Sequence, residues 1–212
     1  MATGGQVDLI DFIHVPKNGG TTIKTLVNTQ GPEFFIRYHG HETGPVGLGG
    51  DQLIILRDPI DRFCSAVRYA LNTWQVDAGV DNPSDFALAM QDANHQHHNK
   101  VMSEVRNTEH RVGDELLEWK WTYSRQQLWY HEGQRVMLFE HLEEDMGLLF
   151  RSHGLQRPEL PHENATNPEP CQPNDQELSD DARQCLEEIY RLDIQLYEEY
   201  RNMDPNARLR IP

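Results

Sequence analysis

Short apolar runs alternate with helical patterns along this chain of 212 residues. Residues 9–15 are apolar at nearly every position, which is typical of a strand buried on both faces of a parallel sheet. Similar runs at 33–38, 52–56 and 136–139 predict three further strands. Strands that alternate with helices predict an α/β fold, here a three-layer sandwich with a central, mostly parallel sheet of about four or five strands.

Helical periodicity follows most of these runs. Asp58 and Pro59 are residue types for an N-cap and a first helical position. The helix that they begin is expected to bury one apolar face, formed by Phe63, Val67, Ala70 and Trp74. Further helices are expected at 83–91, 115–131, 142–150 and 179–196. A length of 212 residues is typical of one domain, so residues 1–212 are expected to form a single domain, and the chain has no internal repeats.

The turn after the first strand has the features of an anion-binding loop. It reads Pro16-Lys17-Asn18-Gly19-Gly20-Thr21-Thr22. The two glycines let backbone N–H groups approach a ligand, and the two threonines are N-cap types for the helical pattern that follows. A helix N-terminus presents free N–H groups and a positive dipole end, to which Lys17 adds a full charge. We therefore expect a phosphate or sulfate group here, the simpler alternative being an ordinary strand-to-helix turn.

The position of the lysine narrows the choice of ligand. A Walker-type nucleotide loop places its lysine after the glycines, beside a hydroxyl that binds Mg²⁺. In this chain Lys17 precedes Gly19 and Gly20, so the Walker pattern is absent. A small-molecule kinase that uses ATP and Mg²⁺ is therefore a weaker hypothesis, and a non-catalytic nucleotide- or anion-binding module is the other alternative.

A second motif follows the strand at 52–56. It reads Arg57-Asp58-Pro59-Ile60-Asp61-Arg62-Phe63-Cys64-Ser65. Arg57 stands at the carboxyl end of a strand, where open α/β sheets bind ligands, and Ser65 lies about two turns into the next helix. A guanidinium fork together with a hydroxyl is what a terminal phosphate monoester needs.

Together the two motifs resemble those of the sulfotransferases that use 3′-phosphoadenosine 5′-phosphosulfate (PAPS), and most closely the branch of heparan sulfate 2-O- and chondroitin sulfotransferases. That family carries a P-K-[TS]-G-G-T-[ST] loop and a later R-D-P-x-x-R-x-x-S motif, from which Asn18 is one mild departure. The resemblance implies a P-loop-like fold. It also implies transfer of a sulfuryl group from PAPS to a hydroxyl acceptor, a carbohydrate or a small molecule, with 3′-phosphoadenosine 5′-phosphate (PAP) as product.

The same resemblance implies which residues bind the nucleotide. The loop residues that would hold the 5′-phosphosulfate are Lys17, Gly19, Gly20, Thr21 and Thr22, with Asn18 counted among the cofactor-binding residues. Arg57 and Ser65 would hold the 3′-phosphate. Lys17 is also expected to act in catalysis, by stabilising the charge on the phosphate oxygen that leaves.

A histidine pair between the two motifs can supply a base. Sulfuryl transfer to a hydroxyl requires removal of the acceptor proton as the S–O bond forms, and an imidazole suits this role. His39 and His41 follow the run at 33–38, and the resembled 2-O-sulfotransferases have a His-Gly-His sequence here, in which a histidine is the base. We expect His41 to be the base in preference to His39, with Glu42 in reserve. Histidines that only pack or cap a strand end are the alternative.

A further group of histidines, His95, His97 and His98, is expected to lie in a polar loop. No HExxH or zinc-type Cys/His spacing accompanies them, and a PAPS-dependent transferase needs no metal, so we predict no metal site. Their role stays open, since lining an acceptor cleft is the alternative to a solvated loop. Residues 154–175 form a second long polar stretch, for which a lid over the nucleotide and an ordinary surface loop are both compatible readings.

Charge and composition limit the partners and the location. The net charge is −15, and residues 159–199 hold twelve acidic residues against only Arg183 and Arg191. A field of this sign repels polyanions, which argues against nucleic acid and against a highly sulfated glycan. No run approaches the roughly 20 apolar residues of a membrane span, and three cysteines are too few for a disulfide framework. We expect a cytoplasmic protein, or else a chain whose N-terminal anchor has been removed.

Overall fold

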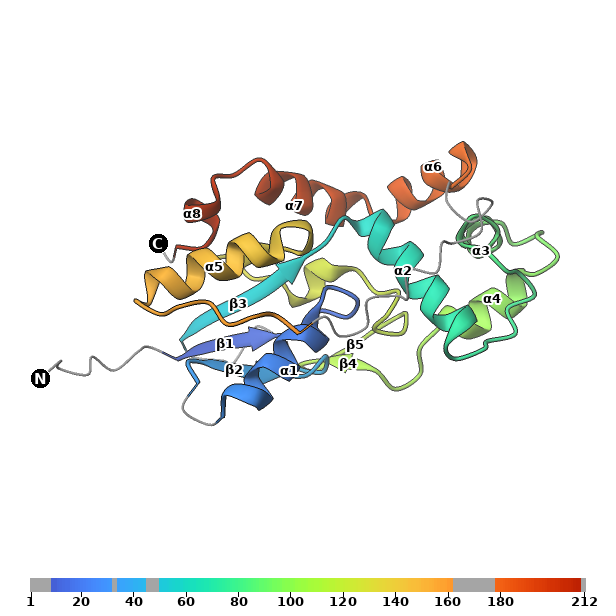
Figure 1. The fold of residues 1–212 in the computed structure, drawn as a ribbon. Helices are drawn as coiled ribbons and strands as arrows, with labels where there is room; N and C mark the ends of the chain where they lie inside the picture. The colour runs from blue at the N-terminus through green and yellow to red at the C-terminus, as the bar shows by residue number, and fades with distance from the viewer. Residues whose placement is uncertain (1–8, 32–33, 45–49, 162–177, 211–212) are drawn as a thin grey trace, which may run out of the picture.

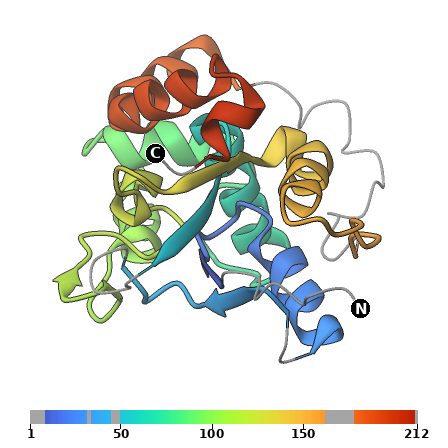
Figure 2. The same ribbon diagram turned by 90° about the vertical axis from the view of Figure 1, so that its left-hand side faces the viewer.

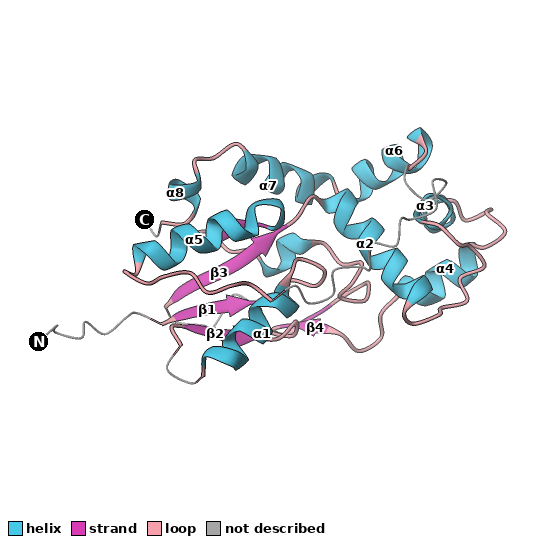
Figure 3. Cartoon of the chain, viewed as in Figure 1, coloured by secondary structure: helices cyan, strands magenta, loops and turns pink. Residues whose placement is uncertain are grey.

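The centre of the protein is a parallel sheet, seen in a computed structural model that describes residues 9–31, 34–44, 50–161 and 178–210 (Figures 1 and 3). Its strands are β1 (Ile10–Ile13), β2 (Ile36–His39), β3 (Asp51–Leu56) and β6 (Arg135–Leu138). Their order across the sheet is β2-β1-β3-β6, and each neighbouring pair is parallel. The predicted α/β class, the four predicted strands and the parallel sheet are therefore confirmed.

Helices cover both faces of this sheet. Because successive strand residues point to opposite faces, Leu53 and Ile55 pack on one side of β3 and Ile54 packs on the other. The first side is covered by α1 (Gly20–Gln30) and α5 (Leu142–Ser152), which lie together in Figure 2. The second side is covered by α7 (Arg191–Arg201), the 3₁₀ helix η1 (Gln126–Trp129), and the hairpin of β4 (Arg111–Val112) and β5 (Glu115–Leu116). This arrangement is consistent with the three-layer sandwich.

A second group of helices packs around a core of its own, beyond the carboxyl end of the sheet (Figure 1). It consists of α2 (Pro59–Asn72), α3 (Pro83–Gln91), α4 (His98–Val105) and α6 (Asp180–Ile189). The large side chains fully buried in this core are Phe63, Phe86, Tyr123 and Tyr190. The described elements also include η2 (Phe139–His141) and α8 (Pro205–Arg208). Within the described ranges, no helix is both long and apolar enough to cross a membrane.

The single helix predicted at 115–131 is wrong. This stretch holds β5, a turn at 121–124 and η1. Two of its main-chain oxygens accept hydrogen bonds from Arg62 of α2, at Trp121 (3.2 Å) and at Ser124 (2.8 Å). The hydroxyl of Ser124 donates to the oxygen of Trp119 (2.8 Å). These hydrogen bonds take the place of the main-chain hydrogen bonds of the helix that the apolar spacing predicted.

Other helix predictions are corrected at their ends. The helix α2 stops at Asn72 because the chain turns at Gln75 (φ 53°), so Trp74 is 52% exposed instead of buried. The stretch predicted as one helix at 179–196 breaks at Tyr190, whose buried hydroxyl donates to the main-chain oxygen of Tyr123 (2.7 Å). His98, predicted in a loop, begins α4.

Several sequence predictions fall partly outside the described residues. Residues 162–177 are among them, so the long loop predicted at 154–175, a lid or an ordinary surface loop, is described only up to Pro161. Cys171 also lies there, whereas Cys64 and Cys185 are buried free thiols. Leu160 and Pro161, just before this gap, line the cleft described below.

The N-cap of α2 leads to a prediction of stability. Asp58 Oδ1 accepts hydrogen bonds from the N–H groups of Ile60 and Asp61, both at 2.9 Å, so the predicted cap is confirmed. Replacing Asp58 with Ala leaves these two N–H groups without their acceptor. The free energy of unfolding should therefore fall by about 1 kcal/mol. Urea denaturation measures this change. The exposed Glu109→Ala variant should unfold as the wild type does, and an equal midpoint for Asp58→Ala would contradict the prediction.

Candidate active site

A cleft of about 800 Å³ opens at the carboxyl ends of β1 and β3. The strand order is β2-β1-β3-β6. From β1 the chain continues to β2, towards one edge of the sheet, and from β3 it continues to β6, towards the other edge. The point between β1 and β3 is therefore a topological switch point. Open α/β sheets bind ligands in the crevice at such a point. Both predicted motifs contribute to the lining of this cleft, through Lys17, Gly19, Gly20, Thr21, Thr22, Arg57 and Ser65.

The predicted anion loop wraps around the start of α1. Gly19 is the N-cap, with φ 77°, and Gly20 is the first helical residue. Thr21 and Thr22 therefore lie in the first turn and not at the cap that their residue types suggested. A Cβ on Gly20 would lie 1.8 Å from Cδ2 of His14, so only glycine fits against that ring. The N–H of Thr22 donates to the main-chain oxygen of Gly19 (3.0 Å). The N–H groups of Gly20 and Thr21 have no acceptor within the helix, and with the helix dipole they favour an anion.

Lys17 lies in this cleft with a lowered pKa. Its φ of 67° is in the left-handed region, and its Nζ lies 3.8 Å from the centre of the Tyr69 ring. Burial, and then the positive charges of Arg57 and Arg62, lower the pKa of Lys17 to about 8. A bound anion would stabilise the ammonium form, so the cleft favours negatively charged ligands.

Arg57 connects the two motifs directly. Its Nη1 donates to the main-chain oxygen of Lys17 (3.0 Å), and its Nε and Nη2 bind the carboxylate of Asp61 (2.8 and 2.6 Å). The guanidinium carbon lies 4.3 Å from the centre of the Phe139 ring. The side chain of Arg57 is 14% exposed and lines the cleft, as does Ser65 of α2. The structure therefore brings together the lysine and the arginine that the sequence predicted to act on one ligand.

Asn18, predicted among the cofactor-binding residues, lies apart from the residues that line the cleft. Its side chain is buried, and its Nδ2 donates to the main-chain oxygen of Ile55 (2.7 Å) and to Oε1 of Gln126 (2.8 Å). Gln126 in turn donates from Nε2 to the main-chain oxygen of Arg57 (2.9 Å). Asn18 thus links the predicted anion loop directly to β3 and, through Gln126, to Arg57 of the second motif. Its side-chain N–H groups are used inside the protein.

Two further buried residues position the loops, and the sequence interpretation gave neither of them a definite role. Arg62 donates from Nε to the main-chain oxygen of Pro16 (2.9 Å) while binding the turn at 121–124, so it holds the two walls of the cleft together. Gln126 is held in turn by Asp193, whose carboxylate accepts the N–H of Gln126 (2.7 Å). Arg62 belongs to the second motif, but its burial depends on contacts that no local pattern indicates.

His41 lies in the cleft with one ring nitrogen fixed. Its Nδ1 donates to the main-chain oxygen of His14 (3.0 Å), and a carbonyl can only accept, so Nδ1 carries the proton. Burial is the main cause of a pKa below the usual value for this ring. A neutral ring with its proton on Nδ1 has a free lone pair on Nε2, the form that a general base requires. The loop is held as well, since Trp129 Nε1 donates to the oxygen of His41 (2.8 Å).

His39 and Glu42, the other candidates for a base, are not among the residues that line this cleft. The Nε2 of His39 donates to Asp11 Oδ1 (2.8 Å), an acceptor that also binds Arg37 (2.6 Å). The carboxylate of Glu42 lies over Gly40, with both oxygens 2.6 Å from the position of a Cβ there. Of the three candidates, the geometry therefore favours His41.

Part of the cleft wall is aromatic. His110 stacks on Trp121, with ring centres 4.2 Å apart and an interplanar angle of 13°, and both line the cleft. The Trp121 ring is fixed by its Nε1, which donates to the main-chain oxygen of Arg111 (2.9 Å), and its centre lies 5.4 Å from that of His41. A flat, fixed aromatic surface beside a candidate base is suited to hold an acceptor molecule.

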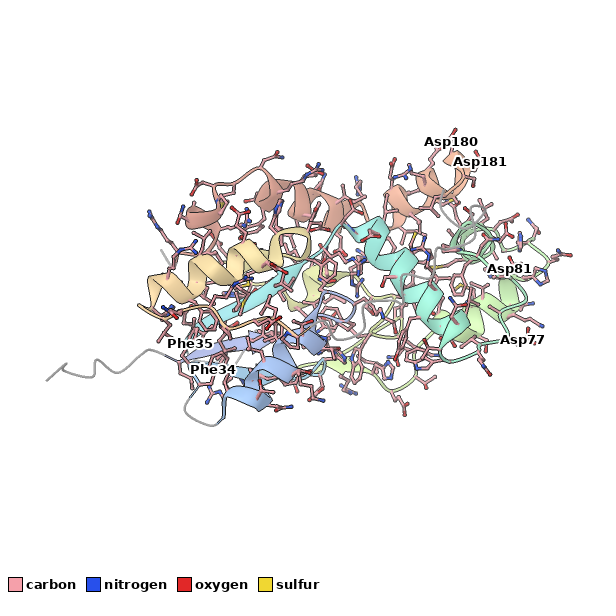
Figure 4. All side chains as sticks on the ribbon, in the orientation of Figure 1. Phe34, Phe35, Asp77, Asp81, Asp180 and Asp181 are labelled. Atoms are coloured by element: carbon pink, nitrogen blue, oxygen red, sulfur yellow. The ribbon has the colours of Figure 1, made fainter. Side chains whose placement is uncertain are left out.

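His95 and His97 line a different hollow, of about 590 Å³, with Asp77, Asp81 and Asp85. Figure 4 shows Asp77 and Asp81 at the end of the molecule near α3 and α4, away from the labelled Phe34 and Phe35. The ring of the third histidine, His98, donates from Nδ1 to the main-chain oxygen of Ala89 (2.8 Å). These histidines are thus separate from the cleft that holds His41.

Taken together, the cleft combines an end with two cationic side chains and a helix N-terminus, a neutral imidazole and an aromatic wall. Across the part of the chain that the structure describes, no group of three or more His, Cys, Asp or Glu side chains is arranged to hold a metal ion. Comparisons of the chain with protein-family models, with curated proteins and with solved structures find no match.

Proposed function

We propose that this protein is a PAPS-dependent O-sulfotransferase with a P-loop-like nucleotide site. The observation that carries the proposal is the junction of the two motifs in one cleft, where Arg57 donates to the main-chain oxygen of Lys17 (3.0 Å). The neutral ring of His41 lines the same cleft. Two cationic side chains from neighbouring strand ends suit a ligand with an anionic group at each end. The resemblance of the two motifs to those of PAPS-dependent sulfotransferases supports the same conclusion.

The residues present fit such a nucleotide. The 5′-phosphosulfate would be held by Lys17 and by the free N–H groups in the first turn of α1, where Gly20 lets the ring of His14 lie against the helix. The 3′-phosphate would be held by Arg57 and the hydroxyl of Ser65. The product PAP keeps both phosphates and would occupy the same groups.

The transfer step needs one base and one stabilised leaving group. The acceptor oxygen forms a bond to sulfur while the bond between sulfur and the 5′-phosphate oxygen breaks, and that bond pair stays on the phosphate oxygen. His41 Nε2 would take the acceptor proton, because its lone pair is free and its ring is neutral. Lys17 would stabilise the charge on the leaving oxygen, since preorganised donors act where charge develops.

The acceptor that we propose is a hydroxyl on a carbohydrate or small molecule without a high negative charge. Its ring or apolar face would lie on Trp121, beside His41. The net charge of −15 opposes the approach of polyanions such as nucleic acid or heavily sulfated glycans.

Calorimetry with PAP, and separately with ATP and Mg²⁺, tests the nucleotide class. We expect PAP to bind without Mg²⁺ and to bind more tightly than ATP–Mg²⁺. Labelled PAPS should then transfer its sulfuryl group to at least one member of a panel of sugars, alcohols and phenols. Tighter binding of ATP–Mg²⁺ would favour a kinase, and PAP binding without any transfer would favour a non-catalytic module. Either result contradicts the proposal.

Asp61 offers a prediction about the 3′-phosphate site. Its carboxylate binds the Arg57 fork that we assign to the phosphate, so the two anions compete for one guanidinium. Replacing Asp61 with Asn should therefore tighten PAP binding by about 0.5–1 kcal/mol, which is two- to fivefold. Calorimetry measures the change, with Asp85→Asn, remote from the cleft, as the control. Weaker PAP binding in Asp61→Asn would show that Asp61 orients Arg57 instead of competing for it.

A further inference from the structure

His14 lines the cleft, and the transfer step described above uses no atom of its ring. The residue follows β1 directly and is 7% exposed. The Cδ2–Nε2 edge of its ring lies against the first residue of α1, since a Cβ on Gly20 would be 1.8 Å from Cδ2 and 2.2 Å from Nε2. Within the described residues, the His14 ring makes its hydrogen bond through Nδ1, and Nε2 has no hydrogen-bond partner. A ring nitrogen without a protein partner, on a largely buried side chain that lines the cleft beside a helix N-terminus, points to a ligand.

The hydrogen bond at the other ring nitrogen leaves Nε2 free to carry the ring proton of His14. Nδ1 is 2.5 Å from Oη of Tyr38. Burial, and then the charge of Glu42, raise the pKa of Tyr38, so its hydroxyl keeps its proton and can donate it to Nδ1. Burial, and then nearby positive charges, lower the pKa of His14 to about 3, so the ring is neutral. A neutral ring that accepts at Nδ1 carries its only proton on Nε2, the atom beside Gly20.

We propose that His14 donates a hydrogen bond from Nε2 to the anion bound at the start of α1, and that Tyr38 holds the ring in this form. The inference rests on the proposed function and deepens it, by adding a contact to the transferred sulfuryl group or to the 5′-phosphate. Hydrogen bonds to a charged partner are stronger than those between neutral groups.

The same residue also orients the base. The main-chain oxygen of His14 accepts the Nδ1 proton of His41 (3.0 Å), and the two rings lie 4.0 Å apart. His14 therefore positions His41 through its backbone while its side chain binds the anion. A substitution at His14 tests only the side chain, because the backbone oxygen is present in every variant.

Two variants separate the ring nitrogens. The amide nitrogen of Gln can reach the position of Nε2, whereas the shorter Asn can reach only that of Nδ1. The probes are PAP and adenosine 3′-phosphate, which lacks the 5′ group. We expect His14→Asn to weaken PAP binding by about ten- to a hundredfold and to leave adenosine 3′-phosphate within about twofold. His14→Gln should retain most of the PAP affinity, and Tyr38→Phe should lie between the two.

Histidine ¹⁵N spectra of the wild-type protein give a readout that needs no variant. We expect the Nε2–H form of His14, and a shift of the Nε2 resonance when PAP is added. An Nδ1–H form overturns the inference, as does equal PAP affinity in wild type and His14→Asn, or an equal loss of both nucleotides. Wild-type protein that binds no PAP refutes the proposed function as well, whereas normal wild-type binding with an unaffected His14→Asn variant refutes this inference alone.

Discussion

Replacing His41 with Gln is expected to slow sulfuryl transfer by a factor of about 10²–10⁴, the usual contribution of a general base, while PAP affinity stays within about twofold. The physical reason is the tautomer, because the bond from Nδ1 to the main-chain oxygen of His14 leaves the lone pair on Nε2. Gln is polar and of similar reach, but it has no nitrogen that accepts a proton near neutral pH. Single-turnover transfer from labelled PAPS and calorimetry with PAP measure the two quantities separately.

The matched control for this prediction is His39→Gln. His39 is two residues away and of the same type, but its Nε2 donates to Asp11 and it is not among the residues that line the cleft. Transfer by this variant should stay within a few-fold of the wild-type rate. Loss of activity in His39→Gln with normal activity in His41→Gln would assign the base to the other histidine. Loss of PAP binding in His41→Gln would show that His41 binds the nucleotide and does not act as the base.

Replacing Lys17 with Met is expected to affect both binding and chemistry. Met fills a similar volume without the charge, so PAP binding should weaken by about 1.5–3 kcal/mol, or roughly 10- to 150-fold. Transfer at saturating PAPS should fall by a further factor of about 10²–10³, as when one donor to a developing anion is removed. Lys24→Met is the control, because Lys24 is an exposed lysine of α1, the helix that follows Lys17. Unchanged PAP affinity in Lys17→Met would refute the proposed site.

The pH dependence of kcat/KM should reflect both residues. His41 must be neutral to accept a proton, so the rate rises with pH through its lowered pKa, below the usual 6.5. Lys17 must be charged, so the rate falls as pH rises through about 8. In the pH profile of kcat, this decrease in rate should lie at higher pH than in the profile of kcat/KM, because bound PAPS stabilises the ammonium form of Lys17. Lys17→Arg should move it as well, since a guanidinium stays protonated. A falling limb unchanged in Lys17→Arg would assign it to another group.

The anion loop and the second motif were predictable because their signals are local. An apolar run, a proline, two glycines and an N-cap Asp act on the backbone within a few residues, so β1, β3 and the start of α2 follow from the sequence. The stretch at 115–131 was not predictable in this way, because partners far away in sequence decide its conformation. Arg62 binds the oxygen of Ser124 across 62 positions, and no local spacing indicates such a bond.

By itself, the sequence determined the α/β class, the strands and the two motifs, because apolar periodicity and turn chemistry act over short distances. The tertiary structure decided what each polar side chain near the motifs contacts. It turned Asn18 inward onto Ile55, paired His39 with Asp11, and set His41 in the cleft with its Nδ1 proton bound by His14. Neighbouring residues of the same type differ in this way because burial and hydrogen bonds depend on segments that meet only in the folded chain.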